Sequence, residues 1–310
     1  MKSNGIWMRC TLTLIGYFEF FYRHHGADVG FELGPPLIFD VGPRIRTKNL
    51  GNLLALDAVD YGQCPTKWQK SLYPKEYQSK LHIVHEGIDT QVVAPDKAAR
   101  FTIPKTDIEL TTDDEVVTYV ARNLEPYRGF PSFMRSLPAV LAQRPNAQVL
   151  VVGGDDVSYG PKPAGGKSFR TQLLEELGTA IDLKRVHFLG KVPYSSFVKI
   201  LQVSTVHVYL TYPFVLSWSM LEAMSAGCLI VGSRTQPVEE VIRDGENGWL
   251  VDIFSPEEIA GRVVDAFANR DAYSAIRQNA RRTIVENYDL RTICLPAQLR
   301  LVNMAARGMM

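Results

Sequence analysis

Residues 206–227, VHVYLTYPFVLSWSMLEAMSAG, contain the pattern on which the fold depends. Residues 206–210 form an apolar run of strand length, a loop follows, and a helix is predicted to begin near Ser217 and to end at Gly227. Serine is a favoured residue before the first turn of a helix, and glycine is a favoured residue after the last one. A strand, a loop and a helix in this order form the repeating unit of an α/β protein with a parallel sheet.

The same alternation continues on both sides of this stretch. Short runs rich in Val, Ile, Leu or Tyr predict strands that are buried on both faces, and apolar residues three or four apart predict helices between them. The expected strands are 116–121, 148–153, 185–189, 206–210 and 228–232, and the expected helices are 129–143, 168–181, 194–203 and 218–226. We therefore expect an α/β fold with a doubly wound parallel sheet, followed by two or three helices in residues 256–310.

The first hundred residues contain fewer elements. We expect a buried strand at 10–16, a helix at 45–56, a strand at 59–64, a helix at 65–73 and a strand at 81–85. These elements are too few for an independent doubly wound domain of ordinary size. Residues 87–112 are polar and contain two prolines, which predicts a connection between domains.

Composition excludes several classes of protein. The 310 residues include 34 basic and 33 acidic side chains, a net charge of +1, which offers no basic face for nucleic acid. Cysteines at positions 10, 64, 228 and 294 form no C-x-x-C pair, so we expect reduced thiols in a cytoplasmic protein. No apolar run approaches the roughly 18 residues that span a bilayer, although peripheral contact with a membrane stays open.

Two groups of polar residues follow expected strands. Arg122 and Arg128 come after strand 116–121, where two guanidinium groups can clamp a diphosphate. The helix that begins near Ser217 exposes N–H groups that favour phosphate, and Glu222, one turn further, can accept hydrogen bonds from the vicinal hydroxyls of a ribose. The alternative is a pair of surface arginines and a solvated glutamate. Because carboxyl ends of parallel strands meet at one edge of a sheet, we favour a site for a nucleoside diphosphate.

Residues 118–288 resemble the C-terminal, donor-binding domain of family 4 glycosyltransferases, which have the GT-B fold. Besides the arginine loop, the resemblance rests on VVGG (151–154), VHFLGKVP (186–193), LEAMSAG (221–227) and VEEVIRDGENGWLVD (238–252), which occur in the order of the family. The stretch 54–89, which ends in IVHEGID, resembles the end of the family's N-terminal domain and its hinge.

The resemblance implies a role for each residue that matches. Arg122 would bind the diphosphate of a nucleotide-sugar donor, and Glu222 would bind the ribose hydroxyls. Arg128 stands where the family usually has lysine, and it keeps the positive charge with a different geometry. We name these three residues as the catalytic candidates.

The resemblance also assigns a donor-binding surface. The backbone at Ser217 and Trp218 would approach the phosphates or the transferred sugar, and Gly190 to Val192 would line the pocket for the base, in UDP or GDP. One departure concerns the family's pair of carboxylates. The first of the pair, which faces the transferred sugar, is replaced by Phe214 in this chain.

The implied function is transfer of a sugar from a nucleotide diphosphate donor to an acceptor hydroxyl on a glycan, a lipid or a small molecule. The resemblance implies retention of configuration, and because the chain contains no Asp-x-Asp triad we expect no metal. The expected domains are 1–95 (a partial, Rossmann-like N-terminal domain), 96–114 (a connection), 115–290 (donor binding) and 291–310 (a C-terminal helix).

The family's first domain is longer than the part that precedes residue 115, so we expect Met1 to lie inside a longer gene product. The alternative function is a module that binds a nucleotide sugar without transferring it.

Overall fold

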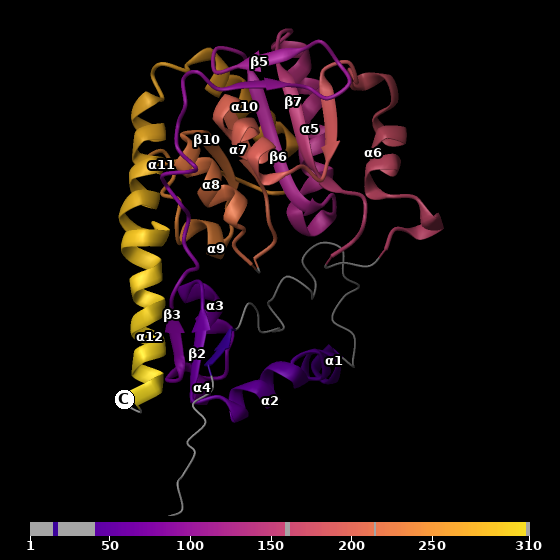
Figure 1. Ribbon diagram of the computed structural model, residues 1–310. Coiled ribbons are helices and arrows are strands. Elements are labelled where there is room, and N and C mark those ends of the chain that lie inside the picture. The colour runs from indigo at the N-terminus through magenta and orange to yellow at the C-terminus, as the bar shows by residue number, and fades with distance from the viewer. Residues whose placement is uncertain (1–14, 18–40, 159–161, 214, 308–310) are drawn as a thin grey trace, which may run out of the picture.

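The computed structural model describes residues 15–17, 41–158, 162–213 and 215–307. These residues form two α/β units, a small N-terminal one and a larger one built on a six-stranded sheet (Figure 1). The two units are connected by residues that follow β3 and by a long helical region at the C-terminus.

The larger unit is organised around a sheet with the strand order β11-β10-β9-β6-β7-β8. Every neighbouring pair is parallel, so all carboxyl ends lie along one edge. The strands are β6 (Val116–Asn123), β7 (Gln148–Gly154), β8 (Val186–Gly190), β9 (Val206–Tyr209), β10 (Leu229–Ser233) and β11 (Trp249–Val251). The five strands expected from the sequence are present. The sixth, β11, was not predicted.

Helices cover both faces of this sheet, as the alternating pattern predicts. One core lies between the sheet and α5 (Phe130–Gln143), α6 (Phe169–Leu177) and α10 (Pro256–Ala268). The opposite core contains α7 (Tyr194–Val203), α8 (Trp218–Ala226), α9 (Gln236–Glu239) and α11 (Ser274–Asn287). The helix expected at 168–181 ends earlier, because Gly178 follows Leu177 as its C-cap.

The helices of the larger unit begin and end at residues suited to those positions. The Ser217 side chain accepts a hydrogen bond from the Ser219 N–H at the start of α8, and Gly227 ends that helix in a left-handed conformation. Gly129 precedes α5 with a φ of 64°, and a Cβ at this position would lie 2.4 Å from the Cβ of Leu210. No other residue fits here without displacement of the strand end.

The N-terminal unit has a parallel sheet with the order β1-β2-β3, formed by β1 (Ile15–Tyr17), β2 (Tyr61–Cys64) and β3 (Leu81–Ile83). Its helices are α1 (Val41–Lys48), α2 (Leu50–Ala58), α3 (Lys67–Leu72) and α4 (Lys75–Gln78). The single helix expected at 45–56 is thus two helices, which meet at Asn49. Of the strand expected at 10–16, residues 10–14 lie outside the described part.

The polar segment after β3 is more than a connection. It contains an antiparallel pair, β4 (Arg100–Thr102) and β5 (Glu109–Thr111). Phe101 and Leu110 are buried in a core that also contains Ile200 of α7. Most residues of this hairpin are polar, and Phe101 and Leu110 attach it to the larger unit. The polar composition is the reason that the sequence pattern did not predict the hairpin.

The N-terminal end of α3 is bound to the larger unit. The carboxylate of Glu240, next to α9, accepts hydrogen bonds from the backbone N–H groups of Lys67 (2.8 Å) and Trp68 (2.9 Å). Thr66 accepts from the N–H of Gln69 and completes the first turn. The Trp68 side chain also packs against the core of the larger unit. The carboxylate of Glu240 in the larger unit therefore caps α3 of the N-terminal unit.

The chain passes between the units twice, and the two passages lie side by side. Ile88 and Asp289 form a parallel bridge in which the N–H of Ile88 donates to Tyr288 and the N–H of Leu290 donates to Ile88, both at 2.8 Å. Gly87 makes this approach possible, since a Cβ there would lie 2.7 Å from the Cα of Leu290.

After the second passage, α12 (Leu295–Arg307) runs back along the N-terminal unit, where Leu301 and Ala305 bury Tyr61 of β2 (Figure 1).

Candidate functional site

The end of β6 and the start of α7 surround a small cavity at the carboxyl edge of the sheet. Its volume is about 270 Å³. Its lining residues come from the ends of three neighbouring strands and from α7: Ala121, Arg122, Val152, Gly153, Lys191, Val192, Tyr194 and Phe197. The walls are mainly apolar, while Arg122 and Lys191 are exposed and bring positive charge to the rim. This combination suits a ligand with a flat, partly apolar body and an anionic part.

Arg128 occupies a different environment from Arg122. A short 3-10 turn (Pro126–Arg128) and the left-handed Gly129 carry its side chain under the loop that follows β9. The guanidinium is buried, and its Nη1 donates to the hydroxyl of Tyr209 (3.2 Å), to Thr211 Oγ1 (3.1 Å) and to the carbonyl of Val215 (3.0 Å). Arg128 therefore braces the loop that leads to α8, and it brings positive charge beneath it.

Glu222 is buried on the first turns of α8. Its Oε1 accepts a hydrogen bond of 2.9 Å from the hydroxyl of Tyr194, which lines the cavity. Burial raises the pKa of Glu222, and the bond from Tyr194 opposes that shift. Tyr194 thus connects the carboxylate on α8 with the cavity that contains Arg122.

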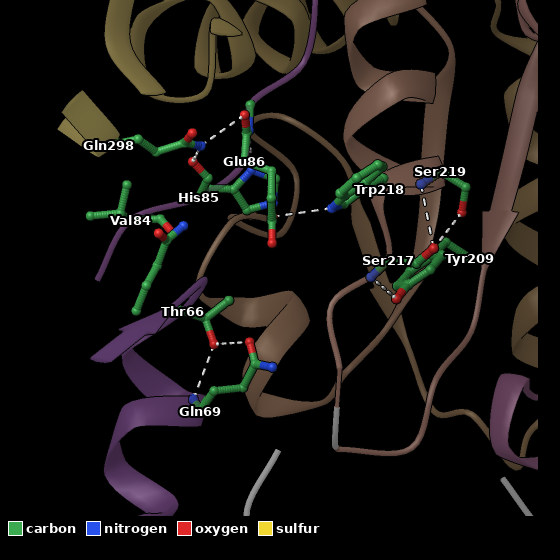
Figure 2. Close-up of polar contacts among 12 residues, drawn as sticks. Thr66, Gln69, Val84, His85, Glu86, Tyr209, Ser217, Trp218, Ser219 and Gln298 are labelled. Carbon is green, nitrogen blue, oxygen red and sulfur yellow. Dashed lines mark hydrogen bonds and ion pairs between the residues drawn. The ribbon is translucent and has the colours of Figure 1, made fainter. Parts of the chain in front are cut away.

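Ser217 and Trp218 form the start of α8. The N–H of Ser217 donates to the hydroxyl of Tyr209 (2.8 Å), the same hydroxyl that Arg128 contacts. The indole of Trp218 is half exposed and points toward the N-terminal unit, where its Nε1 donates to Glu86 (3.2 Å; Figure 2). The sequence predicted a role for the backbone of these residues, but it gave no sign that the Trp218 side chain contacts the other unit.

The residues predicted to hold the base are at the end of β8. Gly190 ends the strand, and the half-buried Val192 packs between two cores and lines the cavity. The structure therefore brings Arg122 and Val192 to one cavity and joins Glu222 to it through Tyr194. Arg128 and Ser217 lie beside the loop before α8, and Trp218 lies at the boundary of the units. Phe214 lies outside the described residues.

One residue of this cavity, Tyr194, was missed by reasoning from sequence. It directly follows VHFLGKVP (186–193), in which the resemblance implies a base pocket at Gly190 to Val192 but no role for the charge of Lys191. Tyr194 occupies the first position of a helix that follows a strand end, and that placement was a usable signal.

A larger cavity, about 740 Å³, lies between the two units. Among the described residues, those that line it include Lys67 and His85 of the N-terminal part and Glu240 and Tyr288 of the larger unit. None of the residues predicted from sequence to bind the donor lines this space. We therefore take the smaller cavity as the candidate donor site.

Comparison with known families agrees with this architecture. The profile for "Glycosyl transferases group 1" matches residues 103–283, more than half of the chain, and that for "Glycosyl transferase family 4 group" matches residues 8–93. The chain belongs to the group 1 glycosyltransferases. The resemblance to family 4 glycosyltransferases drawn from the motifs is confirmed.

Curated relatives have glycosyltransferase names. A D-inositol 3-phosphate glycosyltransferase of Nocardioides sp. is 23% identical over 85% of this chain and 64% of its own length. A phosphatidyl-myo-inositol mannosyltransferase of Mycobacterium tuberculosis is 25% identical over 64% of this chain and 55% of its own. An uncharacterized glycosyltransferase of Methanocaldococcus jannaschii is 33% identical over 34% of this chain and 27% of its own. The chain thus spans between 27% and 64% of the length of these relatives.

Solved structures share the fold. HepE of Anabaena, crystallised with UDP and glucose, superposes with a TM-score of 0.68 at 15% identity, over 94% of this chain and 71% of that one. A sucrose-phosphate synthase of Thermosynechococcus elongatus gives 0.67 at 20% identity, over 84% and 62%. The expected GT-B fold is confirmed. Within the described residues, no helix is both long and apolar enough to cross a membrane.

Proposed function

We propose that this protein transfers a sugar from a UDP- or GDP-linked donor to an acceptor hydroxyl, with retention of configuration and without a metal ion. The observation that carries the proposal is the cavity at the carboxyl edge of the sheet, where Arg122 at the rim and Tyr194, bonded to Glu222, are brought together. A cation, an apolar pocket and an acceptor for hydroxyls are the groups that a nucleoside diphosphate needs.

Each group has a distinct part in this proposal. Arg122 binds the diphosphate directly, because its guanidinium is exposed at the rim. Arg128 acts from below the loop before α8, where its buried charge favours an anion and its hydrogen bonds hold the backbone of the loop in place. The first N–H groups of α8, after Ser217, add the positive end of a helix dipole. Val192 and the backbone at Gly190 contact the base.

The reaction breaks the bond between the anomeric carbon of the sugar and an oxygen of the diphosphate, and both electrons of that bond leave with the diphosphate. The acceptor oxygen bonds to the same carbon on the face from which the diphosphate leaves, and the acceptor proton passes to a diphosphate oxygen. No protein nucleophile is required. The protein accelerates the reaction by stabilising the negative charge that grows on the diphosphate, which is usually the largest catalytic contribution.

The comparisons support this class of activity. The curated relatives named above are glycosyltransferases, and HepE was crystallised with UDP and glucose. These names do not favour a module that only binds a nucleotide sugar. The acceptor is a glycan, a lipid or a small molecule. We place the reaction in the cytoplasm, where the buried thiols of Cys64, Cys228 and Cys294 would stay reduced.

Calorimetric titration with UDP and GDP tests the proposal. Arg122→Ala should weaken binding roughly 10- to 100-fold, because a hydrogen bond to a charged group contributes about 1.5–3 kcal/mol. The matched control is Arg300→Ala, which removes an exposed guanidinium from α12, away from the cavity. Equal affinity of Arg122→Ala and the wild type would exclude Arg122 as the phosphate ligand. Loss of binding after dialysis against EDTA would contradict the metal-free reaction.

A further inference from the structure

Tyr194 contacts the carboxylate of Glu222, which we propose binds the ribose, and it also lines the cavity. It is the first residue of α7, directly after Pro193, and its position follows the end of β8. Its side chain is 54% exposed, yet its hydroxyl is held 2.9 Å from Oε1 of Glu222. Tyr194 therefore lines the cavity, while its hydroxyl donates to Glu222 on α8.

The carboxylate of Glu222 depends on this hydroxyl. Among the described residues, Tyr194 is the hydrogen-bond partner that the structure gives it. Burial and the nearby carboxylate raise the pKa of Tyr194, so its hydroxyl keeps its proton and donates at neutral pH. A carboxylate has about four acceptor positions, and Tyr194 uses one. The remaining positions are left for a ligand, with the orientation of the carboxylate set by the phenol.

The phenol oxygen can also contact the ligand. Once its proton is donated to Glu222, its lone pairs remain available to a hydroxyl that enters the cavity. Arg122 and Val192 line the same cavity, so a ligand whose phosphate binds Arg122 and whose base contacts Val192 would present its pentose to Tyr194 and Glu222. The pentose hydroxyls would then contact the carboxylate of Glu222, which only accepts hydrogen bonds. They would also contact the phenol oxygen of Tyr194, whose orientation is set by its own hydrogen bond to Glu222.

We propose that Tyr194 is a specificity-determining residue that makes the site select a ribonucleotide over a deoxyribonucleotide, by orienting Glu222 toward the pentose hydroxyls. This inference rests on the proposed function, since it assumes that the cavity binds a nucleoside diphosphate. It states that the nucleoside must contain ribose, and it assigns recognition of the ribose hydroxyls to Tyr194 acting through Glu222.

The test is a comparison of ligands as well as variants. The affinities of UDP and GDP and of their 2′-deoxy and 3′-deoxy forms are measured by calorimetry with the wild type and with Tyr194→Phe. The wild type should bind the ribonucleotide at least about tenfold more tightly than one of the deoxy forms, as expected for a lost bond to a charged group. Tyr194→Phe keeps the ring, so the deoxy form should bind within about threefold of wild type, while the ribonucleotide weakens by about tenfold.

A second tyrosine serves as the matched control. The hydroxyl of Tyr273 donates to Asp265 at 2.8 Å on the opposite side of the sheet, so Tyr273→Phe removes the same kind of bond outside the cavity. Tyr273→Phe should keep the wild-type preference for the ribonucleotide over the deoxy form. Glu222→Gln should lose this preference, as Tyr194→Phe does.

Each outcome decides between the two proposals. If Tyr194→Phe keeps the wild-type preference for the ribonucleotide, Tyr194 does not read the pentose, and the inference is wrong while the proposed function stands. If the wild type binds neither UDP nor GDP, the proposed function fails and the inference fails with it. If all variants bind alike and Arg122→Ala alone weakens binding, the site recognises the phosphates only, and the inference is again wrong.

Discussion

Replacing Glu240 with alanine tests how the two units are joined. The N–H groups of Lys67 and Trp68 belong to the first turn of α3, so the helix itself offers them no acceptor. Both oxygens of Glu240 supply one, at 2.8 and 2.9 Å. In the variant these two donors must bond to water, and α3 loses both backbone hydrogen bonds that join it to Glu240 of the larger unit.

The size of the effect follows from exposure. A hydrogen bond to a charged group contributes about 1.5–3 kcal/mol when it is buried. Lys67 is exposed, and Trp68 and Glu240 are half-buried, so water replaces part of each bond. We expect a total loss of about 1–2 kcal/mol, which is also the range for removal of an N-cap. Since 1.4 kcal/mol is a factor of ten, α3 should open roughly 5- to 30-fold more often.

Hydrogen exchange of a peptide that covers residues 65–73 measures this opening directly. Glu240→Ala should accelerate exchange by the factor given above, whereas Glu239→Ala should leave it unchanged. Glu239 is the exposed neighbour of Glu240 and forms no hydrogen bond or ion pair with α3 in the described part of the chain, so it controls for the loss of a charge. Identical exchange in Glu240→Ala and the wild type would refute the view that this carboxylate caps α3.

Two further predictions concern stability. Gly129→Ala should cost more than about 2 kcal/mol in a urea unfolding experiment, because its Cβ would meet Leu210 at 2.4 Å and its φ is 64°, whereas Gly261→Ala, with open space around it inside α10, should be neutral or stabilising. Similar losses in both variants would contradict this reason. Burial would raise the pKa of Asp289, but hydrogen bonds from Thr90 and Thr292 hold it at about 2. An aspartate with a lowered pKa stabilises the folded state at pH values above its ordinary pKa near 4, and this stabilisation is lost as the pH falls toward 2. The difference in the free energy of unfolding between the wild type and Asp289→Asn should therefore shrink from pH 5 to pH 2.5. A gap that stays constant over this range would show that the charge of Asp289 is not the cause.

The sequence predicts those parts of the fold that follow from local periodicity. The bounds of α7 and α8 agree with the expected ranges, because an N-cap or a proline and a following glycine or polar residue mark their ends. The edge strand β11 was missed because its three residues are too few to show a periodic pattern. The β4–β5 hairpin was missed because its buried residues depend on α7, which is distant in sequence.

The candidate site shows the same division between local and distant information. Arg122 follows a strand of the predicted sheet, and Val192 was named from the family resemblance; the structure brings both to one cavity at the carboxyl edge of the sheet. The environment of Arg128 was not predictable, because a 3-10 turn and a left-handed glycine redirect a side chain that is only a few residues further along. The bond between Tyr194 and Glu222 joins two helices, and no pattern within either helix indicates it.

The paired passages at Ile88 and Asp289 limit the ways in which the molecule can move. A unit tethered at one point can swing and twist in every direction, whereas two tethers bonded to one another leave mainly rotation about the line on which they lie. Closing such a unit over a bound substrate means fixing about one angle instead of several. Little orientational entropy is then lost on closure, and more of the binding free energy is left for the proposed sugar transfer.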